Sequence, residues 1–254
     1  MGTTPAALIK HGIETTIVEI DPVVHKFASQ YFNLPSNHIA AIEDATAFVK
    51  RSQNSAKYDY IVHDVFTGGA EPVELFTLEF LRGLDSLLKP DGVIAIVRLF
   101  FFFFFFFFHN YPPSMFLADR KQNWAGDISL YPAALTVRTI QAVFPACRIF
   151  REEAAPQDNQ DFTNMVIFCK KSAATPLRFR DPAPADYLGS KSREAYLIPK
   201  YELDPARFAS IQRGGRSVLV AKEAGRLHKY QDRGALEHWK IMRDVLPDAV
   251  WESW

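Results

Sequence analysis

Hydrophobic residues along the first two thirds of the chain follow two alternating periods, one typical of strands and one typical of helices. Short apolar or β-branched runs predict strands at 15–20, 38–44, 58–64 and 93–97, followed by two closing strands at 147–152 and 163–171. Helical spacing predicts helices at 22–32, 45–52, 71–92 and 131–144. Since helices separate the first strands, the pattern predicts an α/β fold with a doubly wound, mostly parallel sheet.

Residues with known positional preferences mark the ends of these helices. Pro22 stands in the first turn of one helix, and Asp44 is placed to cap the helix that begins at Ala45. The sequence Lys89-Pro-Asp-Gly92 is a helix stop signal, and it predicts the end of the 71–92 helix.

The pattern changes near residue 172. Residues 172–193 are rich in proline and polar residues and predict a linker or docking arm, whereas residues 234–254 predict a helix with one apolar stripe. We interpret the stripe as packing on the main domain, with a partner interface as the alternative. The sequence therefore predicts a domain at 1–171 and an extension at 172–254.

Composition and charge exclude some function classes. Of the 254 residues, 29 are Lys or Arg and 29 are Asp or Glu, so no net field favours nucleic acid or a membrane surface. The apolar stretch from 99 to 108 is about half the ~20 residues that cross a bilayer. Cys147 and Cys169 have no metal-ligand spacing and favour a reducing compartment, and the first residues lack the features of a secretory signal. We therefore expect a cytoplasmic chain without a metal site.

Three acidic residues follow successive predicted strands, at the sheet edge where α/β proteins bind ligands. Glu19 can accept hydrogen bonds from a ribose diol, Asp44 can reach an adenine amino group, and Asp64 faces the reacting end of a bound nucleotide. Each alone is a weak signal, because acids after strands also cap helices. The ordered series is more specific. Gly2 and Thr3 open a helix, as a nucleotide-binding turn does.

The run from GTTPAALI (2–9) through IVEIDP, IEDATAFV and YDYIVHDVF to LKPDGVIAI resembles the spermidine/spermine synthase family of the class I S-adenosylmethionine-dependent methyltransferase superfamily. The resemblance implies a Rossmann-like sheet of seven strands, the last antiparallel. It also implies a small-molecule acceptor, which could be a polyamine, and it leaves a homodimer open. S-adenosylmethionine or its decarboxylated form would be the cofactor, bound by Gly2, Thr3, Glu19, Asp44 and Asp64.

One departure from the family concerns catalysis. Aminopropyltransferases of this family read Asp-x-x-Asp-Pro at the third site, whereas this chain has Thr67 three residues after Asp64. Threonine cannot act as a general base near neutral pH. Two hypotheses follow: a transferase in which methyl transfer is favoured over aminopropyl transfer, and a non-catalytic relative that keeps the fold as a binding module. We interpret His63 as a packed residue in preference to a base.

A second departure is at the start of the chain. The resemblance places a central first strand before the glycine turn, and this sequence begins within that turn. We therefore expect an N-terminally incomplete form of a longer protein, in which two strands have lost their shared neighbour.

Nine consecutive phenylalanines, Phe100 to Phe108, suit neither a strand, a membrane segment nor an exposed loop. Phenylalanine codons contain only pyrimidines, a valine codon can open an intron and a glutamine codon can close one. Residues 97–122 are therefore interpreted as a translated intron or a disordered insert. Its removal joins Ile96 to Asn123 and brings Asn123 and Asp127 to the acceptor side of the site.

Overall fold

The structure is a computed structural model of the chain, and it describes residues 2–53, 58–65, 72–98, 128–152, 154–155, 163–211 and 218–227. The chain forms two compact units. The N-terminal unit comprises residues 1–57 and 178–199, and the central unit comprises residues 58–177 and 200–254. Each unit is described separately below.

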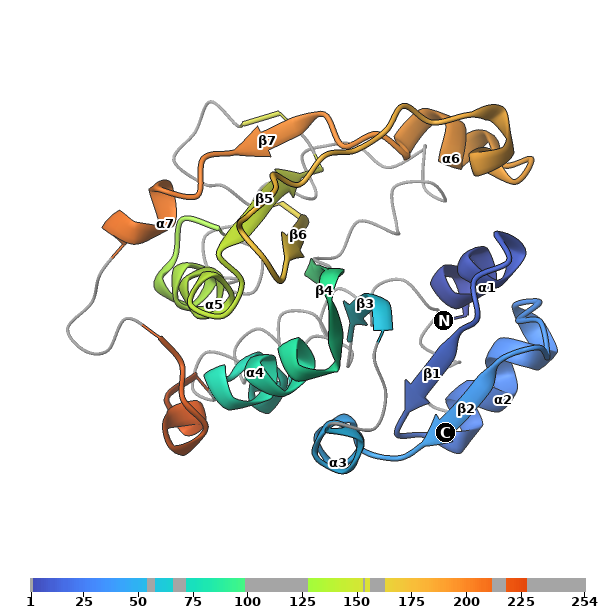
Figure 1. The fold of residues 1–254 in the computed structure, drawn as a ribbon, viewed down its shortest axis with the longest axis horizontal. Helices are drawn as coiled ribbons and strands as arrows, with labels where there is room; N and C mark the ends of the chain where they lie inside the picture. The colour runs from blue at the N-terminus through green and yellow to red at the C-terminus, as the bar shows by residue number, and fades with distance from the viewer. Residues whose placement is uncertain are drawn as a thin grey trace, which may run out of the picture. The chain divides into compact units, whose positions relative to one another are not determined.

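The N-terminal unit alternates helices and strands as the sequence predicts (Figure 1). Its elements are α1 (Thr3–Lys10), β1 (Thr16–Glu19), α2 (Pro22–Tyr31), β2 (Ile39–Ile42) and α3 (Ala45–Ser52). The two strands pair in parallel, from Thr16 opposite Ile39 to Glu19 opposite Ile42. A small apolar core holds the unit together and consists of Ala6, Ile9, Ala28 and Leu34, with Ile17 packed against it.

The central unit contains a five-stranded sheet in the order β3–β4–β6–β5–β7. Its strands are β3 (Tyr58–Asp64), β4 (Leu88–Arg98), β5 (Ala146–Arg151), β6 (Met165–Lys170) and β7 (Tyr201–Leu203). β3 and β4 are parallel, whereas β6 runs antiparallel to both of its neighbours. The antiparallel closing strand that the resemblance implied is thus confirmed.

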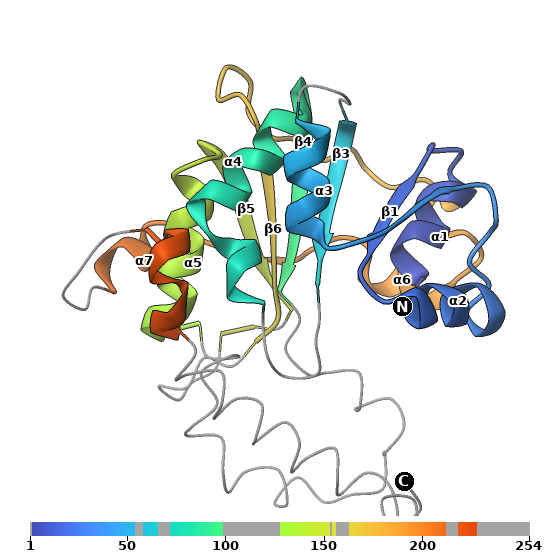
Figure 2. The ribbon, with the colours of Figure 1, turned by 90° about the horizontal axis from the view of Figure 1, so that it is seen from below.

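Two helices, α4 (Leu78–Leu87) and α5 (Tyr131–Gln141), lie along one face of this sheet (Figure 2). Their inward side chains and those of the strands form the larger core. Its fully buried members include Leu81, Leu87, Leu135, Ile140, Ile94, Ile96, Ile149 and Ile167. Each such fully buried aliphatic side chain contributes about 1.5–3 kcal/mol of hydrophobic stabilisation.

The predicted helix at 71–92 is wrong in extent. A short 3-10 helix, η1 (Val73–Phe76), comes first, and the chain then takes an extended conformation at Thr77. The Thr77 hydroxyl accepts the Phe80 N–H and so caps α4. The helix ends at Leu87. Leu88 is already the first residue of β4, and it pairs with Tyr58 of β3. Residues 89–92 were predicted as a helix stop. In the structure they interrupt the pairing of β4 with β3, which resumes at Val93 opposite Tyr60.

Part of the predicted extension joins the central unit. β7 adds to the edge of the sheet by pairing with β5. Farther along, η5 (Ala221–Leu227) follows Leu219, which is buried. The Leu219 N–H donates to the Thr139 hydroxyl over 2.8 Å, and its carbonyl accepts the Leu78 N–H over 2.8 Å. On α5, Arg138 donates to the carbonyls of Phe208 and Ile211, on either side of the end of α7 (Arg207–Ser210).

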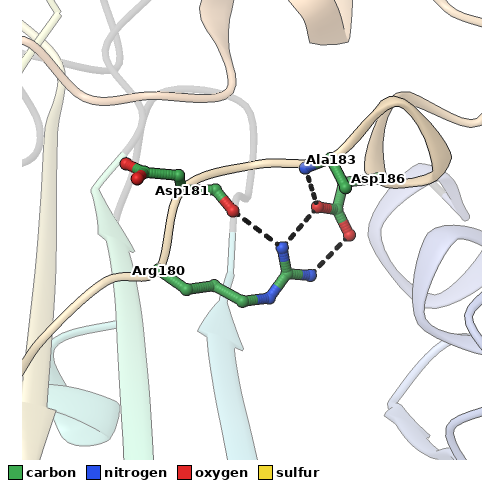
Figure 3. Close-up of polar contacts among 4 residues, drawn as sticks. All are labelled: Arg180, Asp181, Ala183 and Asp186. Atoms are coloured by element: carbon green, nitrogen blue, oxygen red, sulfur yellow. Dashed lines mark hydrogen bonds and ion pairs between the residues drawn. The ribbon is translucent and has the colours of Figure 1, made fainter.

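The proline-rich arm is ordered by local polar contacts (Figure 3). Both terminal nitrogens of Arg180 donate to the Asp186 carboxylate over 2.6 Å, and the Ala183 N–H donates to the same carboxylate over 2.7 Å. These contacts hold the pKa of Asp186 well below its ordinary value, with Arg180 as the main cause. They fix the turn η4 (Pro184–Tyr187), which precedes α6 (Lys191–Tyr196).

β1 and β3 are the strands expected to flank a missing first strand. Within the described residues they are not paired with each other, and each ends its own sheet. Tyr60 and Val62 on β3 are exposed, whereas Val93 and Ala95, their partners on the same face of the neighbouring β4, are half-buried. This difference is the one expected between an edge strand and an interior strand.

Two further expectations concern the insert and the cysteines. β4 continues into the start of the 97–122 segment, since Val97 pairs with Asp64 and Val166. The phenylalanine run lies outside the described residues, as does the predicted helix at 234–254.

Cys147 and Cys169 lie directly opposite each other on β5 and β6 and form a disulfide. Disulfides are uncommon in reducing compartments, so this pairing runs against the sequence-based expectation for the cysteines.

None of the described helices combines the length and the apolar character needed to cross a membrane.

Candidate functional site

Glu19 and Asp44 stand at the ends of two neighbouring strands of the N-terminal unit: Glu19 is the last residue of β1, and Asp44 comes two residues after the end of β2. Because β1 and β2 are parallel, their carboxyl ends reach the same edge of the small sheet. The Glu43 N–H donates to the Glu19 carbonyl over 3.0 Å and holds the two strand ends together. The structure therefore brings Glu19 and the residues around Asp44 to one edge, as the sequence predicts.

Glu19 is half-buried at the last position of β1. Its Oε1 atom accepts the Asp21 N–H over 3.0 Å, while Asp21 itself caps α2 by accepting the Val23 N–H over 2.7 Å. One oxygen of Glu19 thus orients the carboxylate within the turn. The second oxygen can accept hydrogen bonds from a ligand, and an ionised carboxylate is a strong acceptor for a diol.

Asp44 caps α3, as the sequence predicts. Its Oδ1 atom accepts the backbone N–H groups of Thr46 and Ala47 over 2.9 and 3.0 Å, and it also accepts the Thr46 hydroxyl. These hydrogen bonds, with that of the Thr46 side chain as the largest contribution, lower the pKa of Asp44 and keep it ionised near neutral pH. Because the cap uses Oδ1, the Oδ2 atom is the acceptor that a ligand can reach.

Two apolar side chains at the same edge were not predicted as site residues. Ile20 follows Glu19 and is 67% exposed, and Ile42 precedes the Glu43-Asp44 pair and is 42% exposed. Exposed aliphatic side chains beside ionised carboxylates form a surface that suits a flat, apolar ring with polar edges. The signal in the sequence was their position directly at the strand ends, next to the acids.

Gly2 and Thr3 begin α1 in the same unit. Gly2 has a φ of 74°, in the left-handed region that favours glycine, and no side chain caps the helix. A β-carbon at Gly2 would approach that of Ala28 to 3.2 Å, so the glycine also permits α1 to pack closely on α2. The glycine turn therefore has a packing role in addition to the binding role that the sequence suggests.

Asp64 belongs to the central unit, where it is the last residue of β3 and is exposed. The preceding residue, His63, is buried between aromatic rings, as the sequence interpretation proposed. Three other predicted site residues, Thr67, Asn123 and Asp127, lie outside the described residues. Their roles stay predictions.

These residues fit the adenosyl part of an adenosylmethionine-type cofactor. The free oxygens of Glu19 and Asp44 match the hydroxyl groups of a ribose and the amino group of an adenine, and Ile20 and Ile42 match the faces of its rings. In the part of the chain that the structure describes, no three His, Cys, Asp or Glu residues are grouped as metal ligands.

Comparison with known proteins finds relatives of the chain. Residues 2–103 match the family described as the spermine/spermidine synthase domain. The whole chain is similar to an N-terminal histidine N-methyltransferase from Emericella nidulans, with 60% identity over 263 aligned positions that cover 42% of that protein. A polyamine aminopropyltransferase from Vibrio vulnificus is 39% identical over 98 residues, which cover 37% of this chain and 33% of the relative.

A solved structure supports the fold. The crystal structure of a probable spermidine synthase from Corynebacterium glutamicum has a TM-score of 0.51 at 17% identity, covering 83% of this chain and 64% of that one. The chain thus has a Rossmann-like α/β fold, as that structure does. Residues 2–103 are similar to the spermine/spermidine synthase domain. The chain spans less than half the length of the curated relatives that it matches.

Proposed function

We propose that the chain is part of an S-adenosylmethionine-dependent methyltransferase that acts on the N-terminal histidine of a polypeptide. The observation that carries this proposal is the 60% identity, along the entire chain, to a protein named for that activity. The likeness to aminopropyltransferases is lower and covers little more than a third of the chain.

The residues favour methyl transfer for a chemical reason. A polyamine nitrogen has a pKa near that of lysine, about 10.4, and must lose a proton before it can attack. The acid that would assist is replaced by Thr67. An N-terminal histidine offers an imidazole with a pKa of about 6.5 and an α-amine of about 7.7–8.0. Both nitrogens are substantially neutral at pH 8, so neither requires a strong general base.

In this proposal, the chain's own residues bind and orient. Glu19 accepts the ribose hydroxyls, Asp44 accepts the adenine amino group through Oδ2, and Ile20 and Ile42 contact the ring faces. For Asp64, the role at the positively charged end of the cofactor is implied by the resemblance in sequence to the spermidine synthase family. When bound, S-adenosylmethionine supplies a methyl group whose bond to sulfur breaks as the bond to the acceptor nitrogen forms, and the acceptor's proton passes to water. Positioning then provides much of the rate.

The test is a transfer assay with labelled S-adenosylmethionine and a peptide that begins with histidine. The expected product is the peptide heavier by one methyl group, and fragmentation by mass spectrometry shows whether the imidazole or the α-amine carries it. The matched control peptide begins with alanine and should not react. Decarboxylated S-adenosylmethionine with putrescine tests aminopropyl transfer, and product there instead would refute the proposal.

The second candidate, a non-catalytic binding relative, rests on Thr67 in place of the family's acid. It predicts that S-adenosylmethionine binds in calorimetry while no acceptor is modified. The transfer assay and the calorimetric titration together separate the two.

A further inference from the structure

His63 occupies an unusual position for a polar side chain. It is 5% exposed and lies on β3 opposite Ile96, which is 1% exposed. The edges of two aromatic rings enclose it, with centroid distances of 4.8 Å to Phe76 and 5.9 Å to Phe80. Among the described residues, its Nδ1 and Nε2 atoms have no hydrogen-bond partner.

An imidazole in this environment destabilises the fold. Burial lowers the pKa of His63 to about 4, so at neutral pH the ring is uncharged and carries one N–H donor and one acceptor nitrogen. A buried polar group without a partner is unfavourable, and an apolar group of the same shape avoids this loss. The ring therefore occupies a place in which phenylalanine would be better for stability alone.

The position of His63 connects it with the candidate reaction. It directly precedes Asp64, and successive side chains of a strand point to opposite faces, so His63 packs beneath the strand end while Asp64 is exposed. Phe76 and Leu75 belong to η1, the next described element after β3. Burial lowers the pKa of His63, and the backbones of His63 itself and of Leu75 partly oppose this effect, although no described group has hydrogen-bond geometry to the ring nitrogens.

We propose that His63 is a positioning residue for the transfer reaction: its N–H forms a hydrogen bond with the Leu75 carbonyl when cofactor occupies the carboxyl end of β3. This bond joins η1 to the strand end and fixes the backbone of Asp64. Polar contacts in such sites are often long or poorly aligned without ligand and tighten in the complex. The inference rests on the proposed function, because it concerns the same cofactor.

The rival interpretation is that His63 only fills space. His63→Phe separates the two, because it keeps an aromatic ring between Phe76 and Phe80 but has no ring nitrogens. If the ring only packs, this variant transfers methyl groups as well as the wild type. If the N–H is required, the variant loses turnover even though it is more stable.

The experiment combines three measurements on the 254-residue chain, its His63→Phe variant and a Tyr60→Phe control, which changes an exposed residue on the same strand. We expect His63→Phe to melt a few degrees higher than the wild type, since ~1 kcal/mol corresponds to about 2–4 °C at this size. Its kcat should fall about tenfold or more, while KM for S-adenosylmethionine changes little. Tyr60→Phe should match the wild type in both.

The third measurement reports on the ring itself. In protein with ¹⁵N-labelled histidine, the His63 nitrogen signals should shift when S-adenosylmethionine is added. Equal turnover of His63→Phe and wild type, or His63 signals that do not respond to saturating cofactor, overturns the inference and leaves the proposed function standing. Absence of product from every protein, the wild type included, is instead a failure of the proposed function, and the inference then falls with it.

Discussion

The imidazole of His63 meets the ring of Phe76 edge-on, with 4.8 Å between their centroids and 69° between their planes. The contact places a titratable group inside an apolar layer, where its neutral form is strongly favoured. The folded-state pKa of about 4 and the ordinary value of 6.5 then define a range of pH in which stability changes.

We expect stability to fall as the pH is lowered from about 6.5 to about 4. In that range the unfolded chain binds a proton that the folded chain does not, so unfolding is favoured as protons are added. Above about pH 6.5 the free energy of unfolding has its full value, and below about pH 4 this group causes no further loss. The total loss from this group is about 3 kcal/mol. Urea unfolding of wild type and His63→Phe at several pH values measures it. A difference between the two proteins that does not vary with pH would contradict this prediction.

Asp44 is expected to serve both α3 and the cofactor, and two substitutions separate these roles. Asp44→Asn keeps a good N-cap, so the free energy of unfolding should change little, while affinity for S-adenosylmethionine falls because the amide nitrogen cannot accept from adenine. Asp44→Ala should lose the cap as well, at about 1 kcal/mol. Chemical denaturation and calorimetry measure the two effects. Equal cofactor affinity in wild type and Asp44→Asn would restrict Asp44 to capping.

Glu19→Gln is predicted to weaken cofactor binding with little effect on folding. Glutamine retains an oxygen for the Asp21 N–H, but its amide nitrogen cannot accept hydrogen bonds from a diol. Hydrogen bonds to charged groups contribute about 1.5–3 kcal/mol, so affinity should fall by a factor of about 10 to 150. Calorimetric titration provides the measurement, with Glu14→Gln, an exposed change outside the site, as the control.

Thr139→Val should loosen the docking of residues 218–227. The Thr139 hydroxyl donates to the Leu135 carbonyl and accepts the buried Leu219 N–H. Valine has nearly the same shape but leaves that N–H without a partner, at a loss of about 1–3 kcal/mol. Hydrogen exchange of the Leu219 amide should accelerate. Thr136→Val is the matched control: Thr136 lies on the same helix, its hydroxyl donates to the Pro132 carbonyl within that helix, and its loss should change exchange at Leu219 little.

Reduction of the disulfide between Cys147 and Cys169 should destabilise the central unit. The bridge joins positions 22 residues apart, and closing a loop of that size stabilises a fold by about 3 kcal/mol. Unfolding in the presence and absence of a reductant measures this difference. The Cys147→Ala variant should behave alike in both conditions, and any remaining sensitivity to reductant there would point to another cause.

The local structure of the chain was largely determined by its sequence. β-branched runs and strand-end acids predicted β1, β2 and β3, and Pro22 and Asp44 predicted where α2 and α3 begin, because strand periodicity and helix caps depend on neighbouring residues. The prediction of one helix across 71–92 failed since the apolar spacing is continuous through Thr77, while the backbone there is extended. The local signal for the later helix start is Thr77, a preferred N-cap residue that Glu79 follows in the first turn, and the continuous apolar spacing obscured it.

Pairing between distant segments was decided by the tertiary structure alone. Sequence periodicity did not reveal that β7 joins β5, that Leu219 bonds to Thr139, or that Cys147 lies opposite Cys169, because each contact depends on the register of elements far apart in the chain. The same holds for His63, whose isolation between Phe76 and Phe80 arises from packing. The sequence by itself determined which acids stand at or just after the end of each strand. Only the tertiary structure decided the register in which β1 and β2 pair, and therefore that the Glu43 N–H reaches the Glu19 carbonyl, because this contact joins residues far apart in the chain.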